Sequence, residues 1–76
     1  MAYDPTEVKI LMTVRKWYAS GEARRIRESA SISQVEFAAA LGVSRATVCL
    51  WEAGTRVPER SRALDCWELL NLLKKG

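Results

Sequence analysis

The chain has 76 residues, of which 49% are hydrophobic, and twelve Lys and Arg residues against nine Asp and Glu give a formal net charge of +3. A chain this short cannot enclose two separate hydrophobic cores, so we expect residues 1–76 to form a single domain. The sequence contains no histidine, which excludes histidine zinc sites and the Ser-His-Asp and Cys-His catalytic arrangements. Because no carboxylate pair or metal cluster can be assembled either, we expect no enzyme, no cofactor and no metal.

The cysteines and the apolar stretches bear on the cellular environment. Cys49 and Cys66 lie among apolar residues in a sequence without a secretion signal, so we expect both to be reduced, with a disulfide or redox switch as the alternative. The longest uncharged apolar stretch, residues 37–43, is far shorter than the ~20 residues that a membrane-spanning helix needs. We therefore expect a cytoplasmic protein with no membrane span and no signal peptide.

The first predicted helix covers residues 5–20. Asp4 can cap it, Pro5 suits the first helical position, and Glu7 stands where a capping box needs an acid. Gly21 is suited to ending the helix, since glycine tolerates left-handed backbone geometry. A spacing of three and four residues predicts that one side packs on a core, and this side comprises Val8, Leu11, Met12, Val14 and Tyr18.

Two short helices are predicted next. The first covers residues 22–30. Ser33 caps the second, Glu36 completes a capping box three residues later, and Gly42 ends the helix. The apolar residues of the second helix are Val35, Phe37, Ala38 and Leu41.

The second of these helices meets a further helix at a very short corner. Only Gly42, Val43 and Ser44 connect the two, so the helices must cross at a large angle. Ser44 caps the further helix and Gly54 ends it, which places both helices and the corner within about residues 33–53. We expect Phe37, Leu41, Val48 and Trp51 to supply the buried side, and Arg45, Ala46, Cys49 and Leu50 to face outward.

The last predicted helix covers about residues 59–74, after a loop that ends at Pro58. Its apolar residues cover more than the ~100° stripe that a core-facing helix requires. We expect the surplus to contact a second subunit, with Trp67, Leu70 and Leu73 as candidates. Since the sequence has no strand-like alternation, the expected fold class is all-α with five helices.

The corner and its surroundings carry a resemblance to a known family. The strings that carry it are Ile26-Arg27, Ile32 to Ala38, Leu41 to Val48, Trp51 to Gly54, and Pro58. They resemble the helix-turn-helix regulators of the phage-repressor and Cro type, also called the XRE family, over about half of the chain. The resemblance implies a five-helix, repressor-like DNA-binding domain in which the helix at residues 5–20 is an extra N-terminal element.

In that family the second helix of the motif enters the major groove of DNA. The resemblance therefore implies base contacts from Arg45, Ala46, Cys49 and Leu50. The Arg45 guanidinium can bond guanine O6 and N7 together, with a phosphate contact as the alternative. Ala46 and Leu50 are apolar and suit thymine methyl groups, and Cys49 either joins them or is a passive exposed thiol.

The starts of the two helices carry partial positive charge and free amide donors, which suits them to phosphate groups. Gln34 matches the family's phosphate-clamping glutamine, with a solvated polar residue as the alternative. The resemblance also implies that Arg27 and Glu52 form a structural ion pair that pins the second helix of the motif. The expected phosphate contacts are Ser33, Gln34, Ser44, Thr47 and Arg56, with Arg60 and Arg62 extending the basic edge.

We therefore predict a sequence-specific transcription regulator that binds double-stranded DNA, in the form of a phage or bacterial repressor on an inverted-repeat operator. It would act as a homodimer and be nucleoid-associated in a bacterial or phage-infected cell. Two alternatives stay open: a protein-binding adaptor such as the antitoxin of a toxin-antitoxin pair, and an excisionase-like architectural DNA-binding protein. The helix at residues 5–20 could add to the core, contact a second subunit or dock a protein partner.

Overall fold

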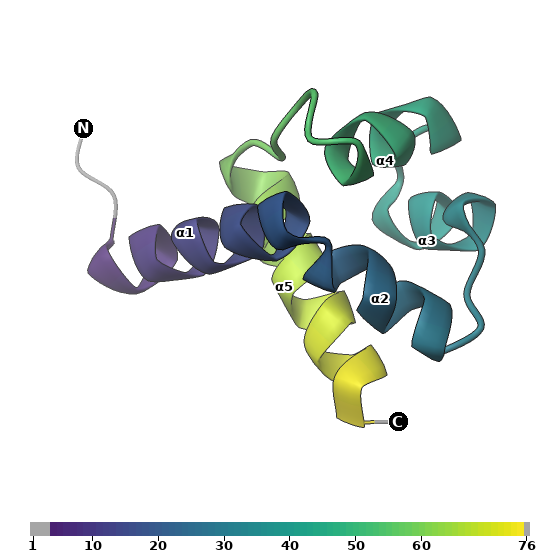
Figure 1. Ribbon diagram of the computed structural model, residues 1–76. Coiled ribbons are helices and arrows are strands. Elements are labelled where there is room, and N and C mark those ends of the chain that lie inside the picture. Colours follow the sequence, from purple (N-terminus) through teal and green to yellow (C-terminus); the bar gives the residue numbers. More distant parts are fainter. Residues whose placement is uncertain (1–3, 76) are drawn as a thin grey trace.

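The computed structural model describes residues 4–75 and contains, in that range, five α-helices and no strand (Figure 1). The helices are α1 (Pro5–Ser20), α2 (Glu22–Ser29), α3 (Gln34–Leu41), α4 (Arg45–Glu52) and α5 (Arg60–Lys75). The all-α, five-helix prediction is confirmed, and each predicted boundary falls within one residue of the observed one. Among residues 4–75, no helix has the length and apolar character needed to cross a membrane.

Two pairs of helices organise the molecule. The contact between α1 and α5 is the most extensive, and that between α3 and α4 is the next. Figure 1 shows α3 and α4 together on one side, while α1 projects toward the opposite side and α5 crosses it. α2 contacts both α1 and α5.

A single hydrophobic core joins all five helices. Tyr18 of α1 lies against Trp51 of α4, with 5.9 Å between the ring centroids, and shares a 3.7 Å hydrogen bond with the sulfur of Cys66 in α5. The structure therefore makes α1 part of the core, which is one of the three roles that the sequence left open. The buried apolar residues are Leu11, Val14, Tyr18, Ala23, Ile26, Phe37, Ala38, Leu41, Val48, Trp51, Ala63, Cys66 and Leu70.

Met12, which was assigned to the packed side of α1, is exposed, and so is the apolar residue Val35 of α3. Met12 is 65% exposed and Val35 is 59% exposed. Each residue of a helix turns by about 100°, so Met12 lies one step off the buried stripe that includes Leu11. Val35 lies two steps from Phe37, on the opposite side of α3. The prediction for Met12 was wrong because the spacing alone did not fix the width of the buried stripe of α1.

The predicted dimer contact at Leu70 is also wrong. Leu70 is 0% exposed, because it lies four residues after Cys66, which lies three after Ala63, and it completes the core-facing stripe of α5. Leu72 is instead 67% exposed. Trp67 and Leu73 are half-buried and pack against the core, with part of each side chain accessible.

The helix caps follow the sequence at α3 but not at α1. Ser33 accepts a hydrogen bond from the Glu36 amide at 3.0 Å, and the Ser33 amide donates to the Glu36 carboxylate at 2.9 Å, which completes the predicted capping box. Asp4 makes no side-chain capping bond. Glu7, the expected partner in that box, instead accepts a hydrogen bond from Arg60 Nε at 2.9 Å, so a contact with α5 replaces the local one.

Candidate nucleic-acid interface

The corner between α3 and α4 has the tight geometry that the sequence predicts. Gly42 has a φ of +72°, in the left-handed region that strains residues with a side chain. Its amide donates to the Ala39 carbonyl at 3.2 Å, and the Val43 amide donates to the Ala38 carbonyl at 3.0 Å. These bonds close the end of α3 and direct the chain into α4 after only three residues.

The start of α4 is capped by side chains. Ser44 is extended and its hydroxyl accepts a hydrogen bond from the Thr47 amide at 3.2 Å. The two hydroxyls of Ser44 and Thr47 also share a 2.9 Å hydrogen bond. The cap fixes where α4 begins and therefore which of its residues point away from the core.

The outer side of α4 is exposed and its inner side is buried. Arg45, Ala46 and Cys49 are exposed, whereas Val48 and Trp51 are buried. Leu50 is half-buried, and its carbonyl accepts the amides of Thr55 and Arg56 at 3.0 and 3.3 Å. Three of the four predicted base-reading residues are thus fully accessible, and the fourth lies at the edge of this surface.

The other end of α4 is fixed by a buried ion pair. Arg27 Nε donates to Glu52 Oε2 at 2.7 Å and Arg27 Nη2 donates to Glu52 Oε1 at 3.0 Å, so the pair that the resemblance implied is present and bidentate. The two side chains are 8% and 5% exposed. Arg27 Nη1 also donates to the Ile32 carbonyl at 2.7 Å, which ties α2 to the loop before α3.

This pair stays ionised despite its burial. Burial raises the pKa of Glu52, but hydrogen bonds from Arg27 and Gln34 and the positive charge of Arg27 outweigh it, so the pKa lies below its ordinary value. The hydrogen bond to Glu52 raises the pKa of Arg27 further. Each residue of the pair therefore keeps the other in its charged form.

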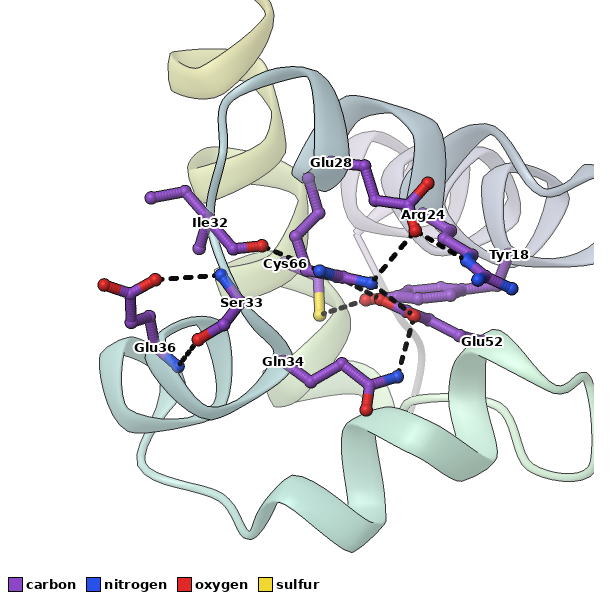
Figure 2. A network of polar contacts seen from close by, with 10 residues as sticks. Tyr18, Arg24, Glu28, Ile32, Ser33, Gln34, Glu36, Glu52 and Cys66 are labelled. Atoms are coloured by element: carbon purple, nitrogen blue, oxygen red, sulfur yellow. Dashed lines mark hydrogen bonds and ion pairs between the residues drawn. The ribbon is translucent and has the colours of Figure 1, made fainter.

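Gln34 is joined to the same carboxylate. Its Nε2 donates to Glu52 Oε1 at 3.0 Å, and Figure 2 shows the two side chains directed toward each other across the space between α3 and α4. This bond was not predicted, because nothing local in the sequence connects residues 34 and 52. The bond holds the Gln34 side chain in place at the first residue of α3. It uses one of the two hydrogens on Nε2 and leaves the other outside this bond.

The sequence of this region matches a known family. Residues 24–72, from α2 to near the end of α5, match the family described as Helix-turn-helix, of the XRE, Cro and CI type. The chain belongs to this helix-turn-helix family. The matched residues cover more than half of the chain, and the family's domain is a DNA-binding domain and not an enzyme. The comparisons with curated proteins and with solved structures gave no match.

The predicted phosphate contacts of the helix-turn-helix domain fall into two groups. Ser33 and Gln34 lie at the start of α3, with Gln34 half-buried. Ser44 and Thr47 lie at the start of α4, and Thr47 lines a hollow together with Arg56. Each group therefore combines a helix start with side-chain donors.

The two arginines expected to extend the basic edge have protein partners. Arg60 is bonded to Glu7 of α1. Arg62 Nη1 donates to the Leu41 carbonyl at 2.8 Å and lies 3.9 Å from Asp65 Oδ2. The bonds to Glu7 and to the Leu41 carbonyl were not predicted, since each joins residues far apart in the sequence.

Proposed function

We propose that this helix-turn-helix protein is a sequence-specific regulator of transcription that reads double-stranded DNA with α4 in the major groove. The observation that carries the proposal is the two-sided character of α4. Arg45, Ala46 and Cys49 are exposed near its capped start, whereas Trp51 is buried and Glu52 is ion-paired at its end. A helix held so firmly on one side presents the other in a fixed orientation, which base reading requires.

Each exposed residue of α4 suits a different feature of the bases. Arg45 can donate two hydrogen bonds to guanine, which is worth ~1–3 kcal/mol of discrimination against other bases. Ala46 offers hydrocarbon to a thymine methyl group, and Cys49 and Leu50 extend this apolar surface. The preferred half-site should therefore combine one guanine with neighbouring thymines.

The phosphate contacts would come from both helix starts. The amide hydrogen of Gln34 that does not bond Glu52 is a donor for a phosphate at the start of α3, beside Ser33. Ser44, Thr47 and Arg56 would serve the next phosphates along the groove. These contacts position the domain on DNA without reading its sequence.

Selection of bound sequences from a random duplex pool tests the proposal directly. We expect an enriched half-site for the wild-type chain, and loss of preference at one base position in Arg45→Ala with the fold intact. Arg24→Ala is the matched control, because Arg24 carries the same charge on α2 and pairs with the exposed Glu28. Gln34→Ala should weaken binding to all sequences alike, and an unchanged base preference in Arg45→Ala would overturn the groove assignment.

The proposed regulator acts as a homodimer on an inverted repeat, a form of repressor suited to a phage or a bacterium. Two half-sites one helical turn apart need two copies of α4 related by a twofold axis. Trp67 and Leu72 line one hollow at α5, and Leu72 and Leu73 line a second one beside it. We assign this accessible apolar surface to the contact between the two copies. Sedimentation that shows only monomers at tens of micromolar, with and without DNA, would contradict the dimer.

A protein-binding adaptor is the second candidate, and one observation favours it. Met12 is 65% exposed on α1 and lines a shallow hollow with Lys9 and Lys16, which suits an apolar segment with acidic neighbours. Affinity for a duplex that falls steeply with added salt indicates a DNA reader, whereas an adaptor alone shows no specific duplex binding at any salt concentration. A strong bend in the bound duplex would instead favour an architectural role.

A further inference from the structure

Within its own helix, Arg62 Nη1 lies 3.9 Å from Asp65 Oδ2, which is beyond hydrogen-bond distance. Arg62 lies in the first turn of α5, where the helix dipole disfavours a cation, and that turn contains no acidic residue. Its side chain is 38% exposed, so it is not simply extended into solvent. Its shorter contact, a hydrogen bond, is made with another helix.

That contact is with the end of α3. Arg62 Nη1 donates to the carbonyl of Leu41, the last residue of α3, at 2.8 Å. The last four carbonyls of a helix lack partners within the helix, and a cation is favoured there by the dipole. The neighbouring carbonyls of Ala38 and Ala39 are taken by the amides of Val43 and Gly42, and Arg62 gives the Leu41 carbonyl its partner.

The guanidinium also lies directly against the corner. A Cβ atom added to Gly42 would be 3.9 Å from Arg62 Nη1, in ordinary van der Waals contact. Arg62 thus connects α5, which belongs to the core with α1, to the three residues that set the direction of α4. The charge is bonded within the protein, and the Arg62 side chain lines the same hollow as Thr47 and Arg56.

We propose that Arg62 is a positioning residue for DNA recognition and not a phosphate ligand: its bond to the Leu41 carbonyl holds the corner and therefore the orientation of α4. This inference rests on the proposed function. A hydrogen bond from a charged group to a partly buried carbonyl is stronger than a neutral one. Its loss would let the corner open while leaving the positive surface that meets phosphates in place.

The first measurement needs no DNA. In Arg62→Met the amides of Gly42 and Val43 should exchange with solvent faster than in the wild type, as followed by NMR. Arg60→Met is the matched control, because it removes the same charge from the same turn of α5 but faces Glu7 of α1. Equal exchange at the corner in wild type and Arg62→Met would overturn the proposal.

The second measurement separates positioning from phosphate binding. Arg62→Met should lose about tenfold in affinity for the selected duplex and keep the wild-type dependence on salt. Arg56→Met, at a proposed phosphate contact, should instead reduce the salt slope by about 0.9. Arg62→Lys keeps a charged donor and should recover part of the affinity, which guards against a variant that merely fails to fold.

The outcomes distinguish this inference from the proposed function. If Arg62→Met reduces the salt slope as Arg56→Met does, Arg62 is a phosphate ligand and the positioning role is overturned. If the wild-type chain binds the duplex and Arg62→Met binds it equally well, the positioning role alone is overturned. If the wild-type chain binds no duplex, both the proposed function and the positioning role are overturned.

Discussion

The two main helix pairs of this protein differ in the polar bonds that tie them to the rest of the molecule. α3 and α4 are surrounded by directed polar bonds, which include the Arg27–Glu52 pair at one end and the Arg62 bond to Leu41 at the corner. α1 and α5 meet mainly through buried apolar residues such as Val14 and Leu70. Polar bonds fix orientation because they depend on angle and distance, whereas apolar burial is non-directional. In the proposed function, the pair that meets DNA at a set angle is tied to its neighbours by these polar bonds, while α1 and α5 share the Arg60–Glu7 and Tyr18–Cys66 bonds.

The largest expected effect comes from removing one partner of the buried Arg27–Glu52 pair. Glu52→Ala leaves the buried guanidinium of Arg27 without its partner and should destabilise the fold by ~3–5 kcal/mol. Urea unfolding at neutral pH measures this loss. Glu22→Ala is the control, because its pair with Arg25 is 40–64% exposed and should contribute under ~1 kcal/mol. Equal losses in the two variants would contradict the role of the buried pair.

Truncating a buried apolar side chain of α5 should reduce the stability of the fold by a comparable or somewhat smaller amount. Leu70→Ala opens a cavity in the core between α5 and its neighbours and should cost ~2–5 kcal/mol. Leu72→Ala, two residues away on the same helix, removes an exposed side chain and should change monomer stability by no more than ~0.5 kcal/mol. The pair of variants also tests the proposed dimer, since only Leu72→Ala should weaken self-association without weakening the fold.

A change of pH should show how much the Arg27–Glu52 pair contributes to stability. The folded pKa of Glu52 lies below its ordinary value, so its contribution is present above the ordinary carboxyl pKa and is lost as pH falls through the folded pKa. The stability difference between wild type and Glu52→Gln should therefore shrink on acidification. Urea unfolding of both proteins between neutral and acidic pH measures this difference. Glu36, whose pKa is also lowered, is present in both proteins, so its contribution cancels in the difference. A difference that grows toward low pH would reverse the assigned sign.

The smallest expected effect is chemical and leaves stability unchanged. Cys49 is exposed on α4, whereas Cys66 is buried between α5 and Tyr18. Burial raises the pKa of Cys66 to about 11, so its thiol stays protonated and unreactive at pH 8. Iodoacetamide followed by mass spectrometry should find the label on Cys49 in the folded chain and on both cysteines in urea. Labelling of Cys66 in the folded chain would show that the α1–α5 contact opens.

Local signals explain why the helix-turn-helix region could be predicted so closely. Ser33 and Glu36 form their capping box, Ser44 caps α4, and Gly42 adopts a positive φ, all as expected. Each of these interactions joins residues no more than four apart, so the sequence contains both partners within one turn. The same local reasoning was wrong at the start of α1, where Asp4 makes no capping bond and Glu7 bonds Arg60, a residue that only folding brings near.

The sequence by itself determined the fold class, the five helices, the corner and, through its family resemblance, the Arg27–Glu52 pair. Only the tertiary structure decided that α1 belongs to the core, that Leu70 is buried while Leu72 is exposed, and that Gln34 and Arg62 are bonded within the protein. The physical reason is the range of the interactions. Caps and turns depend on neighbours in sequence, whereas burial and long-range hydrogen bonds depend on the angles at which the helices pack.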